Sequence, residues 1–367
     1  MRHYPVIVAC LAISACAGAP PVPAAKSAAK PVAQMPAPLV VPEPPGVVLN
    51  ITLPDLTTYA LIRTDGGKST PQVITLAQAG DLLAGFDVIF IGEVHRHLAN
   101  HRAQMDLFRA INERAGPVTL SMEQFERDVQ PVVDDYLAGK IGEVALALKG
   151  RSWQSYGTSY RPLVEYAKEH HLPVIAANAP EEVIRCVGRE GLAFLGHMSP
   201  ATRPWAAAEV HTNDGAYRDK FMGFAMGDSG HGGPPGTKGD AKNPSPIAIR
   251  SFEAQATRDD TMAESIFLHL QKNPGRKVVH LTGSFHSDDF LGTVERLQSR
   301  APQLKIAVVS PTDYDKAENL TLKPADAAGG TLVLAIRALP QPYATPEEMR
   351  AAMREQVATR EKTSCKM

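Results

Sequence analysis

Two short segments of the sequence place a histidine and polar or acidic neighbours at the same spacing, Gly92-Glu93-Val94-His95 and Gly283-Ser284-Phe285-His286. Each segment directly follows a run of apolar, strand-forming residues. Glu93 and His95 are two positions apart, so on an extended backbone both face the same side. Imidazole plus carboxylate suits a divalent metal ion with open coordination positions, and without metal the same groups can act as general base and acid. The plainer alternative is that each residue caps a helix or ties down a loop.

The elements that carry these segments follow from the alternation of strand-like and helix-like patterns along the chain. "DVIFIG" is a continuous apolar run ended by Gly92, as expected of a strand buried on both faces, and "HLANHRAQMDLFRAINERAG" after it has helical spacing. Further strands are predicted at "PVTLSME", "LPVIAAN", "RKVVHLTGSFH" and "KIAVVS", and "GTLVLAI" is expected to close the sheet. This order predicts an α/β fold, a mainly parallel sheet flanked by helices, with a helical or irregular insertion at about residues 192–250.

The polar residues that follow the predicted strands are the first candidates for a site, because ligands of open α/β sheets bind beyond the carboxyl ends of the strands. Four strand ends deliver Glu93, His95, Glu123, Asn178 and His286. We therefore expect Glu93, His95, Glu123 and His286 to lie together, as metal ligands or as catalytic groups. In a hydrolase, Glu93 or Glu123 would activate water, and the histidines would act as ligands or acids.

Other histidines near these strands carry less weight. His101 lies on an apolar face of the predicted helix with Met105 and Phe108, which is typical of a buried core histidine, although the helix could aim it towards the site. His97 is predicted to start that helix. His280, in the middle of a strand, is predicted to be structural.

The N-terminal sequence "MRHYPVIVACLAISACAGAPP" is typical of an export signal, with a short basic head and an apolar stretch too short to span a membrane. "ISAC" resembles a bacterial lipobox, which predicts cleavage before Cys16 and lipid attachment to that cysteine; an ordinary cleaved signal peptide is the alternative. We expect a lipoprotein signal peptide at 1–16, a Pro/Ala-rich linker at 17–47, a folded domain at 48–340 and a C-terminal tail at 341–367. The predicted location is the cell envelope.

The charge of the chain bears on its partners, and its cysteines bear on a possible disulfide. The 367 residues include 38 basic and 39 acidic ones, a net charge of −1, so no nucleic acid is expected as a partner. Of the four cysteines, Cys10 and Cys16 belong to the signal, which leaves Cys186 and Cys365. These two could form a disulfide in an oxidising compartment, or Cys186 could be a buried, inert thiol.

Six motifs in order carry a resemblance to a known family. They are "GEVHRHLANHRAQ", "MEQFERDVQPVVDDYLAGK", "WQSYGTSYRPLVEYA", "VIAANAPEEVIRCVGREGL", "EAQATRDDTMAESI" and "LTGSFHSDDFLGTVERL". Together, from about Asp87 to Ser310, they resemble the ChaN family of haem-binding lipoproteins, within a wider group that contains the Tiki proteases and the erythromycin esterases. The lipobox fits this family too.

The resemblance implies two different functions. ChaN-like proteins are associated with haem or iron uptake at the bacterial outer membrane, which implies a lipid-anchored protein facing the periplasm. Their haem lies between two subunits, so the implied partners are haem or an iron complex and a second copy of the chain. The Tiki and esterase relatives use paired Gly-x-x-His segments and a glutamate for metal-dependent or acid/base hydrolysis, and this sequence keeps that layout in His95, His286 and Glu123. A third interpretation is a non-catalytic envelope scaffold.

For haem, the resemblance implies a tyrosine as axial ligand and basic residues or histidine on the propionates. The candidate ligands are Tyr217 in "DGAYRDKFMGFAM" and Tyr156 or Tyr160 in "WQSYGTSYRP", because tyrosinate is a hard ligand for ferric iron. Arg218 and Lys220 could bind the propionates, and His101 is a lesser candidate. The Tyr217 segment also offers apolar residues to a flat macrocycle, namely Phe221, Met222, Phe224 and Met226. The alternative is a short amphipathic helix that buries these residues in a core.

This region departs from the family pattern, so no haem-binding residue transfers directly. Arg258 in "QATRDD" stands where relatives often have an aromatic residue, which removes any aromatic contact expected there. His211 and His231 could serve haem or metal, but a glycine-rich loop is a poor platform for a precisely placed ligand.

Overall fold

The computed structural model describes residues 45–225, 244–345, 347–352 and 365. Cys16 and the predicted signal peptide lie outside these residues, as do Met226 and His231. None of the helices within the described ranges is long and apolar enough to cross a membrane.

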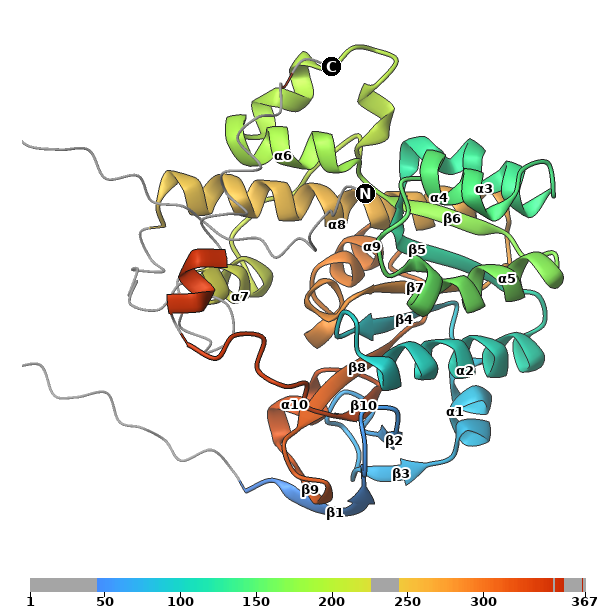
Figure 1. Cartoon of the computed structure of the whole chain (residues 1–367), viewed down its shortest axis with the longest axis vertical. Helices are drawn as coiled ribbons and strands as arrows, with labels where there is room; N and C mark the ends of the chain where they lie inside the picture. The colour runs from blue at the N-terminus through green and yellow to red at the C-terminus, as the bar shows by residue number, and fades with distance from the viewer. Residues whose placement is uncertain (1–44, 226–243, 346, 353–364, 366–367) are drawn as a thin grey trace, which may run out of the picture.

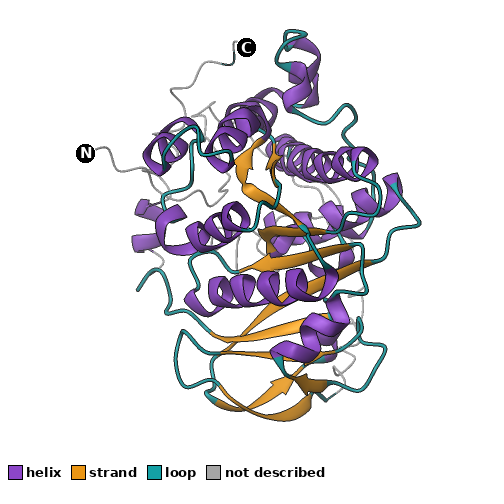
Figure 2. Ribbon diagram, turned by 90° about the vertical axis from the view of Figure 1, so that its right-hand side faces the viewer, coloured by secondary structure: helices purple, strands orange, loops and turns teal. Residues whose placement is uncertain are grey.

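An eight-stranded sheet runs through the centre of the molecule, in the order β3-β2-β10-β8-β4-β7-β5-β6 (Figure 2). The strands from β10 to β6 are parallel to one another, and β2 and β3 add an antiparallel edge. Their bounds are β2 Tyr59–Arg63, β3 Gln72–Ile74, β4 Val88–Glu93, β5 Thr119–Glu126, β6 Val174–Asn178, β7 Val278–Gly283, β8 Ile306–Tyr314 and β10 Leu332–Arg337. The predicted α/β fold with a mainly parallel sheet is confirmed.

Helices cover both faces of this sheet (Figure 1). The first face packs against α1 (Leu76–Leu83), α2 (Leu98–Ala115), α3 (Gln130–Leu137), α4 (Glu143–Lys149) and α5 (Arg161–Glu169). The second face packs against α8 (Pro246–Lys272) and α9 (Thr293–Arg300). Two further helices, α6 (Glu181–Glu190) and α7 (Ala216–Ala225), lie against α8.

The strand β4 is buried along its whole length because it lies between β7 and β8, with helices on both faces. Ile89 and Ile91 belong to the core on the α2 face, and Val88 and Phe90 to the core on the α8 face. A strand buried in this way has its register fixed by both neighbours. Glu93 is thereby placed opposite Gly283 of β7.

Helix α2 begins as the sequence predicted but buries a slightly different face. His97 is its N-cap and accepts a hydrogen bond from the Asn100 N–H at 3.4 Å, so the prediction that His97 starts the helix is confirmed. Leu98, a large apolar residue at the start of the helix, is 56% exposed. The buried side instead includes small residues such as Ala99 and Ala103, whose contribution a search for large apolar residues overlooks.

The last predicted strand does not close the sheet. β10 lies inside it, between β8 and β2, because the antiparallel strands β2 and β3 extend the sheet beyond it. A separate antiparallel pair joins β1 (Val47–Thr52) to β9 (Glu318–Leu322), which precedes the short helix α10 (Pro324–Ala328). Hydrophobic pattern alone predicts strands but not their order.

The predicted insertion contains the 3₁₀ turns Leu192–His197 and Arg203–Trp205 and helix α7, as far as it is described. Next to its first turn, Cys186 of α6 forms a disulfide with Cys365, with their Cα atoms 5.6 Å apart. Of the two alternatives for Cys186, the structure therefore has the disulfide.

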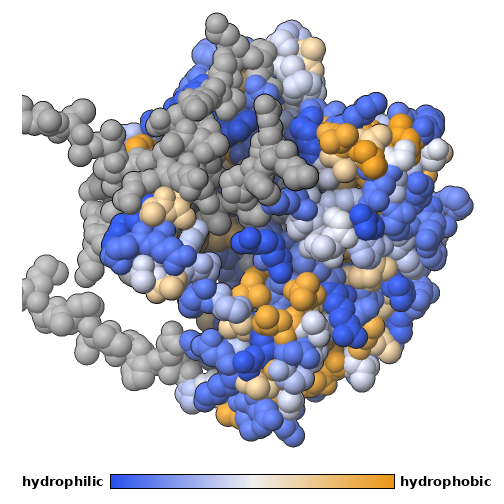
Figure 3. Space-filling model, viewed as in Figure 1, coloured by the Kyte–Doolittle hydropathy of each residue, from blue (hydrophilic) through white to orange (hydrophobic). Residues whose placement is uncertain are grey.

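The surface is mostly hydrophilic in the view of Figure 3, with hydrophobic residues gathered near its centre and over α4 at the upper right. Val144 and Leu148, one turn apart on α4, are 74% and 76% exposed. Their neighbour Leu146 points inwards and is fully buried, so α4 has an apolar side towards the core and a second one towards solvent.

His280 is a buried structural residue of β7, as its mid-strand position predicted. It is 0% exposed, its Nδ1 lies 2.9 Å from the Ser121 hydroxyl, and its ring meets Phe90 edge to face. Burial lowers the pKa of His280 to about 3, so the folded protein holds it neutral.

Acidification should therefore destabilise the fold through His280. In the unfolded chain the imidazole takes up a proton near its ordinary pKa of 6.5, whereas in the folded chain it does so only near 3, so stability is lost as the pH falls through this window. Between pH 7 and pH 5 we expect a loss of about 2 kcal/mol from this group. Urea unfolding of the protein and of His280→Gln at both values checks this: the variant should lose less, and equal losses would contradict it.

Candidate functional site

Polar side chains from three neighbouring strands meet at the carboxyl edge of the sheet. Glu93 ends β4, Glu123 lies near the end of β5, and His286 follows β7 in the short 3₁₀ turn Ser284–His286. The Glu93 Oε1 and His95 Nδ1 atoms are 2.7 Å apart, and the Glu123 Oε1 and His286 Nε2 atoms are 3.7 Å apart. The structure thus brings together the four residues that the strand ends predicted.

Gly283 is the point at which the two pairs meet. A Cβ at this position would lie 3.0 Å from His95 Nε2 and 3.7 Å from Glu123 Oε2. Its backbone N–H also donates to Glu123 Oε2 at 2.6 Å. Only the absence of a side chain leaves room for the His95 ring beside Glu123.

Glu93 is fixed by donors on both of its oxygens. Oε1 accepts from His95 and from the Tyr160 hydroxyl at 2.5 Å, and Oε2 accepts from Gln104 Nε2 at 3.0 Å. Burial alone would raise the pKa of Glu93, but the hydrogen bond and charge of His95 outweigh it, and the pKa is lowered. Glu93 is therefore a buried carboxylate that orients its neighbours.

His95 is the exposed end of the site. Its side chain is 42% exposed, and its ring meets the Trp153 ring edge to face at a centroid distance of 5.4 Å. Burial of the rest of the ring would lower the pKa of His95, but the hydrogen bond and charge of Glu93 raise it overall. Because Glu93 binds Nδ1, Nε2 faces Glu123 and Gly283.

His286 is oriented by Asp259, a residue of α8 that the sequence argument missed. Asp259 is 0% exposed, and its Oδ1 lies 2.7 Å from His286 Nδ1. Burial alone would lower the pKa of His286, but the charges of Asp259 and Glu123 raise it. The signal for Asp259 was weak, because it is one of two adjacent aspartates in a helix that carries other charged residues as well, such as Arg258 and Glu264.

Glu123 carries a stable negative charge between the two histidines. Burial alone would raise its pKa, but the charges of His286 and His95 and the Gly283 N–H lower the pKa of Glu123 to about 2. The Thr282 hydroxyl adds a hydrogen bond at 2.8 Å. Glu123 is thus ionised at every physiological pH.

Asn178 also ends a strand but stands apart from this group. It pairs in register with Glu126, three residues beyond Glu123, and is 2% exposed. Its Oδ1 has no hydrogen-bond partner among the described residues.

The structure gives no support to the metal ion predicted for Glu93, His95, Glu123 and His286. Within the described ranges, no group of three or more His, Cys, Asp or Glu side chains is arranged to hold an ion. The reason is that these side chains are already committed to one another and to protein donors such as Thr282 and Gly283. Their arrangement suits proton transfer instead, with two imidazoles held through Nδ1 by carboxylates, and with Nε2 of His286 3.7 Å from Glu123 Oε1.

The candidate haem residues fall into two separate groups. Tyr160 and His101 lie beside Glu93, with the His101 and Tyr160 rings 5.1 Å apart, and Tyr156 lies in the same core. Tyr217, Arg218 and Lys220 lie on α7, where Arg218 pairs with Asp214 at 3.1 Å and Lys220 with Asp289 at 2.8 Å. The sequence could not show that these groups are apart.

All three tyrosines are buried. The exposed fractions are 5% for Tyr156, 1% for Tyr160 and 3% for Tyr217, and burial raises the pKa of each phenol. The Tyr217 hydroxyl donates to Asp259 Oδ2 at 2.6 Å. Around it, Phe221, Met222 and Phe252 form a small core, so α7 is also the amphipathic helix that was the alternative.

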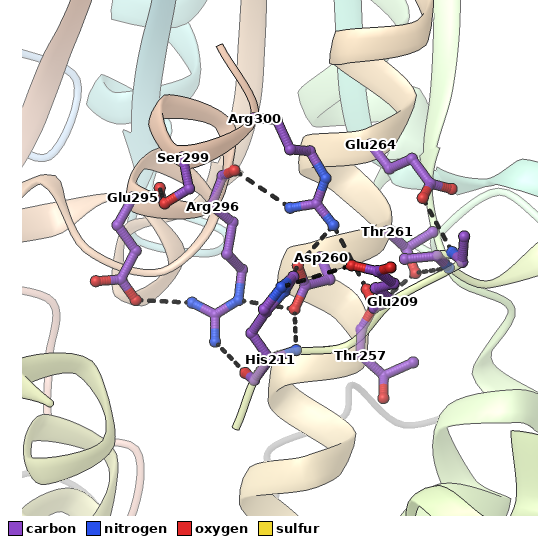
Figure 4. Close-up of polar contacts among 12 residues, drawn as sticks. Glu209, His211, Thr257, Asp260, Thr261, Glu264, Glu295, Arg296, Ser299 and Arg300 are labelled. Carbon is purple, nitrogen blue, oxygen red and sulfur yellow. Dashed lines mark hydrogen bonds and ion pairs between the residues drawn. The ribbon is translucent and has the colours of Figure 1, made fainter. Parts of the chain in front are cut away.

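A pocket of about 500 Å³ opens between α7, α8, α9 and the segment before α7. Among the residues that line it are Tyr217, Arg218, Phe252, His211, Arg296 and Arg300. Figure 4 shows one wall, where Arg296, Arg300 and His211 converge on the buried Asp260. This volume is in the range of small-molecule sites. Of the three candidate tyrosines, Tyr217 lines this pocket, and so does His211.

The sequence model of the family "Haem-binding uptake, Tiki superfamily, ChaN" matches residues 81–297. The chain belongs to this family. The match spans every residue of the strand-end site and of the pocket except Ser299 and Arg300. No curated protein matches the chain.

The chain is also similar to solved structures. ChaN of Campylobacter jejuni, described with cofacial haem binding, is 17% identical with a TM-score of 0.55, over 76% of this chain and 98% of that one. An erythromycin esterase in its open conformation is 11% identical with a TM-score of 0.43, over 78% of this chain and 99% of that one. At 17% identity the similarity to this ChaN protein shows the fold alone.

Two glycines of the site should respond differently to alanine. At Gly92 a Cβ would lie 2.8 Å from the Pro311 ring and 3.2 Å from the Val309 carbonyl oxygen, inside the sheet, so Gly92→Ala should cost about 1–3 kcal/mol. At Gly283 the obstacle is the half-exposed His95 ring, which can move outwards, so Gly283→Ala should cost less. Urea unfolding measures both, and an equal or larger loss for Gly283→Ala would contradict this account.

Proposed function

We propose that this protein is a lipid-anchored protein of the bacterial envelope that binds haem or an iron complex in the pocket between α7, α8 and α9. Its role would be in haem or iron uptake. Membership of the ChaN family supports haem as the ligand class. The observation that carries the choice of site is the presence of Tyr217 in the wall of a pocket of about 500 Å³.

Several residues of the pocket support haem as its ligand, although Glu209, Asp214, Glu264 and Glu295 also line it. Haem supplies an iron centre that takes an anionic oxygen ligand, and a phenolate meets that need. Phe252 gives the pocket apolar surface. Arg218 and Arg300, which pair with Asp214 and Asp260, would turn to the haem carboxylates. To act as a ligand, Tyr217 must give up its hydrogen bond to Asp259.

The cellular part of this proposal rests on the N-terminal sequence. Lipid attachment at Cys16 would hold the protein at the outer membrane, facing the periplasm, and the linker at 17–47 would separate the anchor from the domain. We include a homodimer in the proposal. Mass spectrometry of the membrane fraction should find the diacylated N-terminal peptide beginning at Cys16, and a peptide cleaved elsewhere would contradict the anchor.

Haem titration tests the ligand and the site. Adding haem to the purified protein should shift the Soret band, and Tyr217→Phe should weaken binding at least about tenfold, a loss of about 1.4 kcal/mol. Tyr160→Phe tests the other group of candidates. Tyr136→Phe is a matched control, because Tyr136 is buried and its hydroxyl also donates to a carboxylate, that of the half-buried Glu165, away from both groups.

No Soret shift with the unmodified protein would refute haem binding. A shift that Tyr160→Phe weakens and Tyr217→Phe does not would move the site to the Glu93 side of the sheet.

A second function, hydrolysis of an ester or peptide by acid–base catalysis, is favoured by one specific observation. Two imidazoles, each held through Nδ1 by a carboxylate at 2.7 Å, face the ionised Glu123. Of the two, His95 is the exposed one and is the general base in this proposal. His286, deeper and beside Glu123, is the general acid.

The pH dependence of turnover on chromogenic ester and peptide substrates tests this second function. A base is active only after it loses its proton, so the rate should rise with pH through a midpoint above the ordinary histidine pKa of 6.5. His95→Gln should lower kcat by about 10²–10⁴-fold, whereas His197→Gln, on the exposed surface, should leave it unchanged. Absence of turnover on these substrates would count against hydrolysis.

A further inference from the structure

Asp259 is a single carboxylate shared by the two regions of interest. It is 0% exposed and accepts hydrogen bonds from three side chains of different elements. Its Oδ2 accepts from the Tyr217 hydroxyl of α7 at 2.6 Å. Its Oδ1 accepts from His286 Nδ1 at 2.7 Å and from the Thr293 hydroxyl of α9 at 2.8 Å.

A second residue of α8 joins the same two partners. Gln255, one turn before Asp259, places its Nε2 3.1 Å from the Tyr217 hydroxyl oxygen and 3.3 Å from His286 Nδ1. Tyr217 and His286 therefore share both of their polar neighbours on α8. A change in the position or hydrogen bonding of either ring therefore affects both Gln255 and Asp259.

The packing around Asp259 prevents solvent from replacing a lost partner. Gly292, at the start of α9, has a φ of +60°, and a Cβ there would lie 3.1 Å from Asp259 Oδ1 and 2.6 Å from the His286 carbonyl oxygen. On the other side, the Arg296 guanidinium lies over the Tyr217 ring, 4.9 Å from its centroid. The carboxylate is thus enclosed by α7, α8 and α9, and its donors are protein groups.

We propose that Tyr217 and Asp259 are positioning residues that couple the pocket between α7, α8 and α9 to His286 of the strand-end site. While Tyr217 donates to Asp259, the carboxylate is held by three side-chain donors. A ligand that takes the Tyr217 oxygen removes one of these donors, and Asp259 then binds His286 more strongly. The pocket and the strand-end site are in this way two ends of one hydrogen-bonded network.

The coupling also has a consequence for haem binding. This part of the proposal rests on the proposed function. To bind iron as phenolate, Tyr217 would release its hydroxyl proton to water in the pocket that it lines, and it could then no longer donate to Asp259. Asp259 would stay ionised with one donor fewer, so haem in the pocket would strengthen its hydrogen bond to His286.

The test observes the imidazole Nδ1–H of His286 by NMR in ¹⁵N-histidine-labelled full-length protein. The signal is assigned by its loss in His286→Gln. Tyr217→Phe should move it downfield, because Asp259 with one donor fewer accepts the remaining ones more strongly. Tyr136→Phe, which frees Glu165 instead of Asp259, should leave it in place. An unchanged signal in Tyr217→Phe, or no hydrogen-bonded signal in the unmodified protein, overturns the proposal.

A second arm adds gallium(III) protoporphyrin IX, a diamagnetic analogue of ferric haem. Binding should move the His286 signal in the same direction as Tyr217→Phe does, and should add no further shift in that variant. Binding without any shift overturns the coupling and leaves haem binding intact. If the analogue and haem both fail to bind, the proposed function is refuted, and the coupling stands or falls on the Tyr217→Phe result alone.

Discussion

Buried carboxylates must be supplied with donors, and this requirement organises both regions of interest. Glu93, Glu123, Asp259 and Asp260 are all 5% exposed or less. A carboxylate taken out of water without partners would cost more free energy than most folds have in excess. Each of the four is therefore surrounded by histidine, arginine, hydroxyl or backbone donors from neighbouring elements. The hydrogen bonds and ion pairs between these donors and the carboxylates help to fix the relative positions of β4, β7, α8 and α9.

Part of this arrangement could be predicted from the sequence because the sheet is parallel. Glu93 and His286 were predicted to meet because each follows an apolar run that can only be a buried strand, and parallel strands end at one edge. Asp259 and Gln255 could not be predicted in the same way. They lie in the middle of a 27-residue helix, and nothing in the local pattern shows which face of α8 meets the sheet edge.

The same limit applies to the tyrosines and to the strand order. Tyr160 and Tyr217 looked equivalent as haem ligands because each lies in a segment with aromatic and basic neighbours. Tyr160 directly precedes α5, which packs on one face of the sheet, whereas Tyr217 lies on α7, which packs against α8 on the other side. Their separation is a property of the whole topology. Likewise, the apolar run of β10 predicts a buried strand, but only the pairing with β2 shows that it is an interior one.

The disulfide cross-links α6, the helix that lies against α8, whereas hydrogen bonds and packing alone hold the described strands of the sheet. Cys186 and Cys365 are separated by 179 positions, and their bond fastens α6 to a segment beyond the last strand. The cluster around Cys186, which includes Val183, Val187 and Phe194, is distinct from the cores on the sheet. Because Cys365 follows α8 and all the strands of the sheet in the sequence, this disulfide can form only after those elements have been synthesised. It forms only under oxidising conditions. In a reducing environment this bond would be absent, and α6 would be held by its packing against α8 and against the turn Leu192–His197.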